Sequence, residues 1–305
     1  MLLYSTVIQI RTHQIKGLSL ERLAALVAVG EAGGMAEAAG GEAVRQSLMS
    51  RQIKELEAHF GCALLDRSTL PRRLTPTGEA LAAAAGGFLR TLGTLGADET
   101  DQRAVVTIGG GETVLHHLVL PLVKSWPGLD RARLVLRNLP SHRLVRELEM
   151  RRMDLAVLRA SAVPPTLVHR VVARYGYKLC LPARAKMRGP IKWKDLAKQP
   201  LAVLEGDGGL SRWLRGASAK QGVTLDLAME ATSYPQVAEA IADLGYAGFL
   251  PSFVVPRLPA GRVRAVVLED LSGYQVELAM ARHPQAWDIN PPARSLWAYF
   301  EKKAG

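Results

Sequence analysis

The chain has 305 residues and a formal net charge of +11 at pH 7, a length that allows two or three domains with substantial cores. Hydrophobic residues make up 48% and charged residues 22%, which excludes a collagen-like, low-complexity or wholly disordered chain. Two cysteines, Cys62 and Cys180, are too few for a disulfide framework. The sequence contains neither an apolar run long enough to span a membrane nor the pattern of a secretory signal, so we expect a cytoplasmic protein.

The positive charge is unevenly distributed along the chain. Residues 1–78 contain nine Lys or Arg and seven Asp or Glu, whereas residues 129–188 contain fourteen and four. This excess indicates either a solvated surface or a surface that attracts anionic ligands or DNA phosphates. We favour the solvated surface, because runs of charge usually face water.

Three helices are predicted near the N-terminus. The first covers residues 19–29 with Ser19 as N-cap, and a short second helix covers residues 35–39 between pairs of glycines. The third is the clearest, because it carries one apolar stripe that ends at a glycine: Met49, Ile53, Leu56, Phe60 and then Gly61.

The third helix has a polar, basic outer face. A turn of about 100° per residue places Ser47, Arg51 and Lys54 opposite the apolar stripe, with Arg45 and Gln46 in or just before the first turn. A short arginine-bearing segment follows, so the pattern predicts a winged helix-turn-helix that binds double-stranded DNA. A small helical bundle with a solvated basic face fits the spacing equally well. The candidate DNA-binding residues are Arg45, Gln46, Ser47, Ser50, Arg51, Lys54, Arg67, Arg72 and Arg73.

The next segment, residues 77–96, resembles the seam of a coiled coil. Apolar residues alternate at spacings of four and three, at Leu81, Ala85, Phe88, Leu92 and Leu95. We expect a helix that pairs subunits and is followed by a polar hinge; the alternative is a core helix of one globular domain.

From residue 104 onwards, strands alternate with helices, which predicts an α/β fold with mainly parallel sheets and ligands at the carboxyl ends of the strands. About two hundred residues of this pattern suit two lobes with a cleft between them. We expect strands at residues 105–108, 134–136, 155–158, 177–181, 201–204 and 225–229, and helices at residues 114–126, 141–149, 211–221 and 234–244.

Motifs of enzymes and metal sites are absent from the sequence. There is no HExxH, CxxC or GxSxG pattern, and the adjacent His116 and His117 would project in different directions on a helix. Two glycine-rich turns, at residues 109–111 and 206–209, lack the spacing of a dinucleotide fingerprint, although such turns suit a carboxylate or phosphate. We therefore expect no catalytic residues, no metal and no cofactor.

Several segments in fixed order resemble the LysR-type transcriptional regulators. They are RQSLMSRQIKELEAHFG (45–61), LLDRSTLPRRLTPTGEAL (64–81), VVTIGGGET (105–113) and MDLAVLR (153–159). The resemblance covers almost the whole chain after residue 18. It implies a winged helix-turn-helix, a linker helix that pairs subunits, and a two-lobed effector-binding domain like a periplasmic binding protein. It also implies homodimers or homotetramers that change DNA bending when a small molecule binds.

The resemblance and the chain pattern together predict four segments. These are an N-terminal extension (1–17), the winged helix-turn-helix (18–77), the linker helix and hinge (78–102) and the effector domain (103–305), with its second lobe at about 161–264. The predicted function is sequence-specific DNA binding modulated by a small-molecule effector. The alternative is a solute-binding α/β protein whose helical N-terminus serves only for assembly.

The chain departs from the family pattern in the turn of the helix-turn-helix. Gly34 stands where the family usually has serine, Glu42 where it has leucine, and Arg45 where it has a serine cap. We expect weaker or altered DNA binding from these changes. We hypothesise that Val44 supplies the missing apolar contact.

Candidate effector-binding residues follow strands or open helices and would face the crevice between the lobes. Each could equally be a helix cap or a solvated loop residue. Arg159 is the best candidate for pairing an anionic group, whereas the acidic candidates favour a ligand with an amine or hydroxyls. A sensing disulfide is not expected, since only Cys180 lies in this domain. The candidates are Glu112, Thr113, Ser141, Arg159, Glu205, Asp207, Ser233 and Tyr234.

Overall fold

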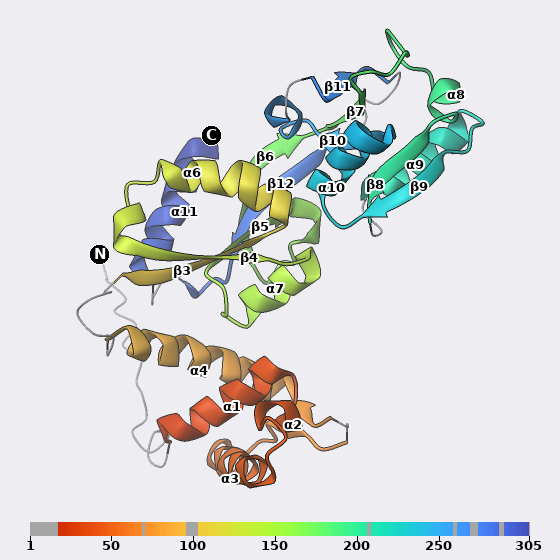
Figure 1. Ribbon diagram of the computed structural model, residues 1–305. Coiled ribbons are helices and arrows are strands. Elements are labelled where there is room, and N and C mark those ends of the chain that lie inside the picture. The colour runs from red at the N-terminus through yellow and green to blue at the C-terminus, as the bar shows by residue number, and fades with distance from the viewer. Residues whose placement is uncertain are drawn as a thin grey trace.

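A computed structural model describes residues 18–68, 71–95, 103–205, 209–258, 261–268, 274–286 and 290–304. The predicted N-terminal extension, the hinge at residues 96–102 and Asp207 lie outside these ranges. Figure 1 shows an elongated molecule, with a small helical domain at one end and two α/β lobes beyond it.

The N-terminal domain contains the three predicted helices, α1 (Leu20–Ala32), α2 (Met35–Ala38) and α3 (Ala43–Phe60). The hydroxyl of Ser19 accepts a hydrogen bond of 3.2 Å from the backbone N–H of Arg22 and caps α1 as predicted. Helices α1 and α3 end at Gly33 and Gly61, whose φ angles of 81° and 67° lie in the left-handed region that favours glycine.

The apolar stripe of α3 forms the core of this domain. Met49, Ile53 and Leu56 are buried together with apolar residues of α1. Phe60, the last predicted member of the stripe, is 42% exposed because it lies in the final turn, past the core. Val44 is 85% exposed in the first turn, so the hypothesis that it supplies an apolar contact is wrong.

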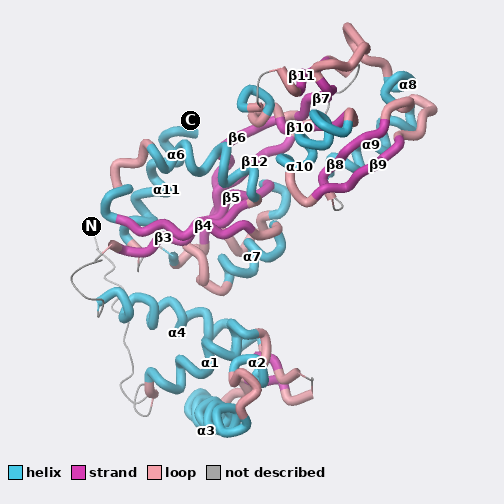
Figure 2. The backbone as a smooth tube through the Cα atoms, in the orientation of Figure 1, coloured by secondary structure: helices cyan, strands magenta, loops and turns pink. Residues whose placement is uncertain are grey.

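A two-stranded antiparallel wing follows α3, with β1 (Leu65–Asp66) paired to β2 (Arg73–Leu74), as Figure 2 shows. The Thr75 hydroxyl donates to the carbonyl of Ala63 at 2.8 Å and accepts from the N–H of Gly78 at 3.0 Å, which joins the wing to the next helix. A Cβ at Gly78 would overlap the carbonyl oxygen of Leu64, so this close approach requires glycine.

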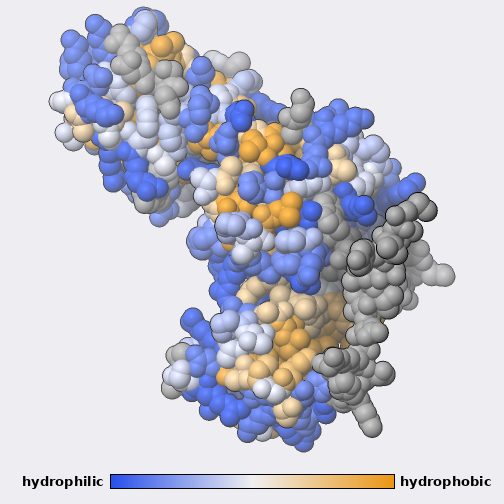
Figure 3. All heavy atoms as spheres, turned by 180° about the vertical axis from the view of Figure 1, so that it is seen from behind, coloured by the Kyte–Doolittle hydropathy of each residue, from blue (hydrophilic) through white to orange (hydrophobic). Residues whose placement is uncertain are grey.

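The linker helix α4 (Pro76–Leu95) matches the predicted segment, but one of its faces is used within the subunit. Ala82 and Ala85 are buried in the core shared with α1, whereas Phe88 remains 49% exposed. From behind, the N-terminal domain shows a broad apolar area (Figure 3). Pairing of subunits through the exposed part of α4 stays a prediction.

Each lobe of the C-terminal region contains one mixed five-stranded sheet. The orders are β4-β3-β5-β12-β6 in the first lobe and β11-β7-β10-β8-β9 in the second. In each sheet two neighbouring pairs are parallel and two are antiparallel, so the expectation of mainly parallel sheets is wrong. The strands are β3 (Ala104–Gly110), β4 (Ala132–Asn138), β5 (Leu155–Arg159), β6 (Val168–Tyr175), β7 (Tyr177–Pro182), β8 (Pro200–Leu204), β9 (Asp226–Ala231), β10 (Ala247–Pro251), β11 (Val263–Val266) and β12 (Val276–Arg282).

The antiparallel strands arise because the chain passes between the lobes. Strand β6 lies in the range expected for the second lobe, yet it pairs with β12 in the first sheet. Only Gly176 separates β6 from β7 of the second sheet, and the chain returns to the first sheet through β12. Strand β12 therefore runs antiparallel to β5 and β6, and β7 runs antiparallel to β10 and β11.

Helices cover both faces of the first sheet (Figure 1). Leu155 and Val157 of β5 face the core shared with α6 and α11, while Ala156 and Leu158 face α7, as expected from the alternation of a strand. The helices are α5 (Glu112–Val114), a π-helix (Leu115–Val119), α6 (Leu120–Lys124), α7 (Ser141–Glu149), α8 (Trp193–Leu196), α9 (Gly209–Lys220), α10 (Tyr234–Glu239), a second π-helix (Ala240–Leu244) and α11 (Pro291–Ala304), with short 3-10 turns at Leu129–Arg131, Ala160–Ala162 and Val255–Arg257.

Candidate functional site

The outer face of α3 presents the predicted polar residues to solvent. Arg45, Ser47, Arg51 and Lys54 are exposed, while Gln46 and Ser50 are half-buried. The Nε of Arg51 lies 3.8 Å from Oε1 of Glu55, and the Arg51 side chain is 74% exposed. Because Arg22 holds Glu55 more closely, at 2.6 Å, the Arg51 guanidinium is available to an external phosphate.

The wing is attached to α3 by Glu57. Its Oε1 accepts hydrogen bonds from the backbone N–H groups of Leu64 and Leu65 at 2.9 and 3.1 Å, and its Oε2 lies 2.8 Å from Arg67. Arg67 is therefore engaged in this ion pair and positions the wing. The sequence pattern included Glu57 only as a family match, because a glutamate near a helix end has no distinctive spacing.

Two other wing arginines, Arg72 and Arg73, are exposed, and within the described ranges no acidic side chain pairs with either. The carbonyl of Arg72 accepts a hydrogen bond of 3.2 Å from the N–H of Met35, so the wing is also attached to the start of α2. These two guanidinium groups can therefore reach a nucleic-acid backbone from a fixed support.

The helices of the turn begin without side-chain caps. Gly34 and Glu42 are the N-caps of α2 and α3, and neither makes a side-chain cap hydrogen bond. Arg45 is the third residue of α3, so the assignment of Arg45 to a cap position is wrong. Glu42 is exposed and does not occupy a core position.

A cavity of about 390 Å³ lies between the two lobes and contains most of the predicted effector-binding residues. Glu205 is exposed and outside the lining, and Asp207 lies outside the described residues. Residues from the first lobe meet residues of β8 and α10 from the second, so relative movement of the lobes would alter the cavity. The predicted residues in the lining are Glu112, Thr113, Ser141, Arg159, Ser233 and Tyr234.

The start of two helices faces this cavity. Ser141 is the first residue of α7, and Ser233 caps α10 by accepting a hydrogen bond of 3.5 Å from the N–H of Gln236. Backbone N–H groups at a helix start are suited to an anionic ligand group. The sheet edges and these helix starts bring together residues that are distant in sequence.

Arg159, at the end of β5, is the cationic group of the cavity. It is half-buried, and no carboxylate pairs with it among the residues that the structure describes. Burial lowers the pKa of Arg159, but the nearby phenol groups, Tyr177 foremost, raise the pKa by more, so the guanidinium stays charged. A Cβ added to Gly209, which opens α9 of the second lobe, would lie 3.2 Å from Arg159 Nη1. The guanidinium thus reaches across to the second lobe.

Tyrosines surround Arg159 at the passage between the lobes. The hydroxyls of Tyr177 and Tyr234 lie 2.7 Å apart, and the rings of Tyr175 and Tyr177 are separated by 5.6 Å. Burial raises the pKa of Tyr175, Tyr177 and Tyr234 above its usual range, so all three are neutral at physiological pH. The sequence prediction missed Tyr175, Tyr177 and Tyr274, because only the tertiary fold brings these strand ends together.

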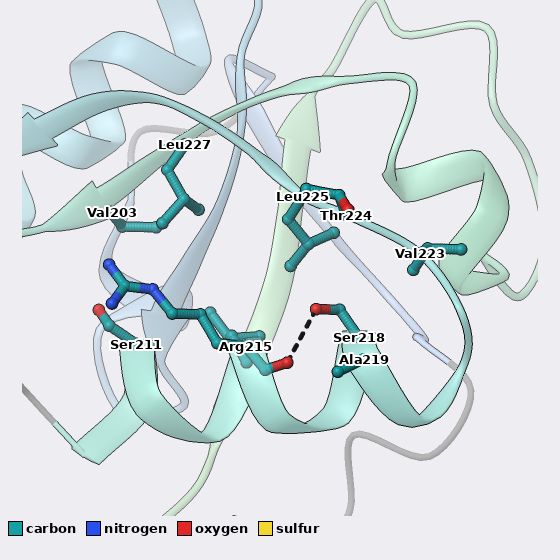
Figure 4. A pocket seen from close by; sticks show the side chains of 10 residues that line it. Val203, Ser211, Arg215, Ser218, Ala219, Val223, Thr224, Leu225 and Leu227 are labelled. Atoms are coloured by element: carbon teal, nitrogen blue, oxygen red, sulfur yellow. Dashed lines mark hydrogen bonds between the residues drawn. The ribbon is translucent and has the colours of Figure 1, made fainter.

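A second cavity, of about 310 Å³, lies within the second lobe between α9 and β9 (Figure 4). Its lining is mainly aliphatic, and the Ser218 hydroxyl donates to the carbonyl of Arg215 at 3.1 Å. All of its lining residues belong to one lobe, and none of them was predicted to bind a ligand. Movement between the lobes would therefore leave this cavity unchanged.

Neither cysteine has a disulfide partner, and burial raises the pKa of Cys180 to about 12. Within the described ranges, no group of three or more His, Cys, Asp or Glu side chains could hold a metal ion. No helix in the same ranges combines the length and the apolar character needed to cross a membrane.

Comparison with known proteins identifies both parts of the chain. The family "Bacterial regulatory helix-turn-helix protein, lysR family" matches residues 20–79, and "LysR substrate binding domain" matches residues 99–305. An uncharacterized HTH-type transcriptional regulator, YfeR of Shigella flexneri, is 24% identical over 296 residues, which cover 92% of each chain.

Two solved structures share the fold at low sequence identity. A full-length OxyR variant from Pseudomonas aeruginosa has a TM-score of 0.63 and 18% identity, with 94% of each chain covered. Full-length CbnR in complex with its target DNA has a TM-score of 0.53 and 19% identity, with 94% of this chain and 100% of that chain covered. The chain therefore belongs to the LysR family of transcriptional regulators, with an N-terminal helix-turn-helix for DNA binding and a C-terminal effector-binding domain.

Proposed function

We propose that α3 and the wing bind specific sites in double-stranded DNA. Arg51 and Lys54 contact phosphates, Gln46 and Ser47 contact base edges, and Ser50 serves either role. Arg72 or Arg73 makes the wing contact, while Arg45 adds positive charge at the start of α3 and Arg67 holds the wing in place. The observation that carries this proposal is the exposed face of α3, where the Arg51 side chain is 74% exposed and its only ion pair among the described residues is the 3.8 Å contact with Glu55.

The DNA-binding proposal is tested with genomic fragments retained by the purified protein at near-physiological salt. We expect recovery of sites with paired half-sites, and broad loss of affinity with a shallower salt dependence for Arg51→Ala. Lys124→Ala, an exposed cation at the end of α6, is the matched control and keeps wild-type binding. Unchanged binding by Arg51→Ala at several salt concentrations would refute the assigned role.

The cavity between the lobes binds the effector, a small molecule with a carboxylate or a similar anionic group. Arg159 pairs this group, supported by the N–H groups at the start of α7. Neutral polar contacts to the ligand come from Thr113, Ser141, Ser233 and Tyr234. The exposed carboxylate of Glu112 accepts a hydrogen bond from an amine or hydroxyl on the same ligand. Glu205 and Asp207 contact the ligand only if the two lobes move closer together.

The effector proposal is tested by thermal unfolding with a panel of small carboxylates, such as benzoate and succinate, and their uncharged amides. A carboxylate that binds the folded protein raises the melting temperature, and Arg159→Gln removes this rise. Arg184→Gln, an exposed arginine of the second lobe outside the cavity, is the control. A rise that survives in Arg159→Gln would place the anion elsewhere.

The protein acts as a homodimer or homotetramer in the cytoplasm, and it converts no substrate. The exposed Phe88 on α4 supports self-association through the linker helix. Sedimentation of wild type and Phe88→Lys tests this point, because a charge at the seam should shift the equilibrium toward monomer. An unchanged sedimentation coefficient would exclude Phe88 from the interface.

A further inference from the structure

Helix α7 connects the cavity between the lobes with the DNA-binding domain. Ser141 and Leu144, near its first turn, line the cavity. Figure 1 shows α7 on the side of the first lobe that faces α4 and α1. A helix of nine residues is about 13 Å long, so its two ends can touch both sites at once.

The far end of α7 touches the DNA-binding domain at two points. Arg146 lies 3.3 Å from Glu79 of α4, with both side chains partly exposed. Just after α7, the Arg152 guanidinium covers the buried Gly30 of α1, where an added Cβ would lie 3.1 Å from Arg152 Nη2. Arg152 is only 17% exposed, so this second contact is the more enclosed one.

The turn that carries Arg152 is both held and strained. Glu147 lies 3.8 Å from Arg152, and its carbonyl accepts a hydrogen bond of 2.8 Å from the Arg152 N–H. Arg151 has a φ of 52°, and no other non-glycine residue in the described part of the chain has a positive φ. Such a conformation is strained for a residue with a side chain and persists where the surroundings require it. The backbone hydrogen bonds that end α7, from Arg151 to Leu148 and from Arg152 to Glu147, hold this turn and place Arg152 against Gly30.

We infer that α7 transmits occupancy of the cavity to the DNA-binding domain of the same subunit through Arg146 and Arg152. This inference rests on the proposed effector site. A ligand group at Ser141 displaces the start of α7, and the helix moves as a rigid element. The displacement changes how Arg146 and Arg152 contact Glu79 and Gly30, which reorients α1 and α4 with the attached α3.

The experiment measures amide hydrogen exchange in the full chain without ligand. Ser141→Trp fills the cavity in place of an effector and is compared in two backgrounds, wild type and Arg146→Gln/Arg152→Gln. We expect Ser141→Trp to change exchange in α1 and α4 by about threefold in the wild-type background and to have no effect there without the two arginines. Arg143→Gln, an exposed arginine on the same helix, is the matched control and preserves the effect.

A second variant approaches the contact from the other side and does not disturb the cavity. Gly30→Ala places a methyl group 3.0 Å from Leu74 Cδ1 and 3.1 Å from Arg152 Nη2, and we expect it to change exchange in α7 by about threefold, but not when Arg152 is glutamine. Equal responses with and without the arginines, or no response of α1 and α4 to a folded Ser141→Trp protein, would overturn the inference.

The readout separates this inference from the proposed function. Hydrogen exchange needs neither DNA nor an effector, so coupling can be seen in a protein that retains no genomic fragment. Specific DNA retention together with an absent exchange response would reject only the role of α7. A persistent exchange response without DNA retention would reject only the proposed DNA binding.

Discussion

Glu57 shows how one side chain can organise a surface that it does not itself form. Its two carboxylate oxygens bind two backbone N–H groups and Arg67, at distances between 2.8 and 3.1 Å. A carboxylate is needed for this arrangement, since an amide offers a single acceptor oxygen. The end of α3 and the start of the wing therefore depend on the same residue.

Glu57→Gln should destabilise the N-terminal domain by about 1 kcal/mol, because the charge-assisted contact with the exposed Arg67 side chain is lost. Urea unfolding followed by circular dichroism measures the change. Glu31→Gln, at an exposed position of α1, is the control with no expected effect. Equal stability of Glu57→Gln and wild type would show that backbone geometry alone holds the wing.

His117 gives the stability a predictable dependence on pH. Burial, followed by the nearby His116 and Arg257, lowers the pKa of His117 from its model-compound value of 6.5. Its Nδ1 lies 3.4 Å from Arg257, and its ring also contacts Phe253. The folded protein therefore takes up this proton at a lower pH than the unfolded chain does, so stability is complete above pH 6.5 and falls as pH drops through the lowered pKa.

Replacing His117 with Phe should reduce the loss of folding stability as the pH falls below 6.5. Urea midpoints measured from pH 7.5 down to pH 5 provide the comparison, with His169→Gln on the exposed part of β6 as control. His283 also has a pKa lowered by burial, then by Arg151 and Arg282, so part of the acid loss persists in His117→Phe. An unchanged slope in His117→Phe would exclude this histidine as a source of the acid sensitivity.

At the scale of elements, the helix-turn-helix contains two helices, α2 and α3, whose first turns receive no side-chain cap hydrogen bond. Gly34 has an extended conformation at the start of α2 and offers no side chain to the first-turn N–H groups. A Cβ there would overlap the flexible end of Glu37, which can move, and would lie 3.3 Å from Pro71 Cβ. The two neighbouring glycines thus differ, since Gly33 has a φ of 81° and Gly34 does not need glycine.

Gly34→Ser should stabilise the domain by about 0.5 kcal/mol, because serine caps α2 and loses less conformational freedom on folding. Gly33→Ser should destabilise it by about 1 kcal/mol, because a serine at a left-handed position is strained. Thermal unfolding of the pair measures both signs in one experiment. A loss of stability in Gly34→Ser would mean that Glu37 cannot leave its place.

At the scale of the whole molecule, the two domains have separate cores. The core that contains Leu26 includes only residues of the N-terminal domain, whereas Leu179 belongs to the core of the two lobes. Arg146 contacts Glu79 as an ion pair and the Arg152 guanidinium covers Gly30, so these contacts add little apolar burial between the domains. We therefore expect two unfolding transitions in calorimetry of the full chain.

Leu26→Ala should lower only one of these transitions, by about 2–5 kcal/mol, and Leu179→Ala should lower only the other. Both side chains are completely buried, which makes the pair a matched test. Differential scanning calorimetry reports the two transitions directly. A single transition shifted by both substitutions would show that the domains unfold together.

Much of the local structure was predictable because it depends on neighbours in the sequence. Ser19, Gly33 and Gly61 set the ends of α1 and α3, and the spacing of Met49, Ile53 and Leu56 determined which face of α3 is buried. The same helical spacing predicted that the basic face of α3 would be exposed. Helix α7 was predicted with its observed bounds, since a strongly amphipathic pattern follows directly after a proline.

The longer-range arrangement was decided by the tertiary structure. Strand β6 is an edge strand with mixed exposure and no clear alternation, so its sequence did not predict it, and β12 pairs with strands far away in the chain. Glu57 and the tyrosines around Arg159 acquired their roles only through contacts made by folding.

By itself, the sequence determined the family, the exposed polar face of α3 and most of the polar residues around the cavity, because periodicity, capping and motif order are local properties. Only the tertiary structure decided the mixed pairing of the sheets and the contact of α7 with both sites. The physical reason is that these features join segments separated by tens of residues, and pairing energies of that kind are not encoded in any short stretch of chain.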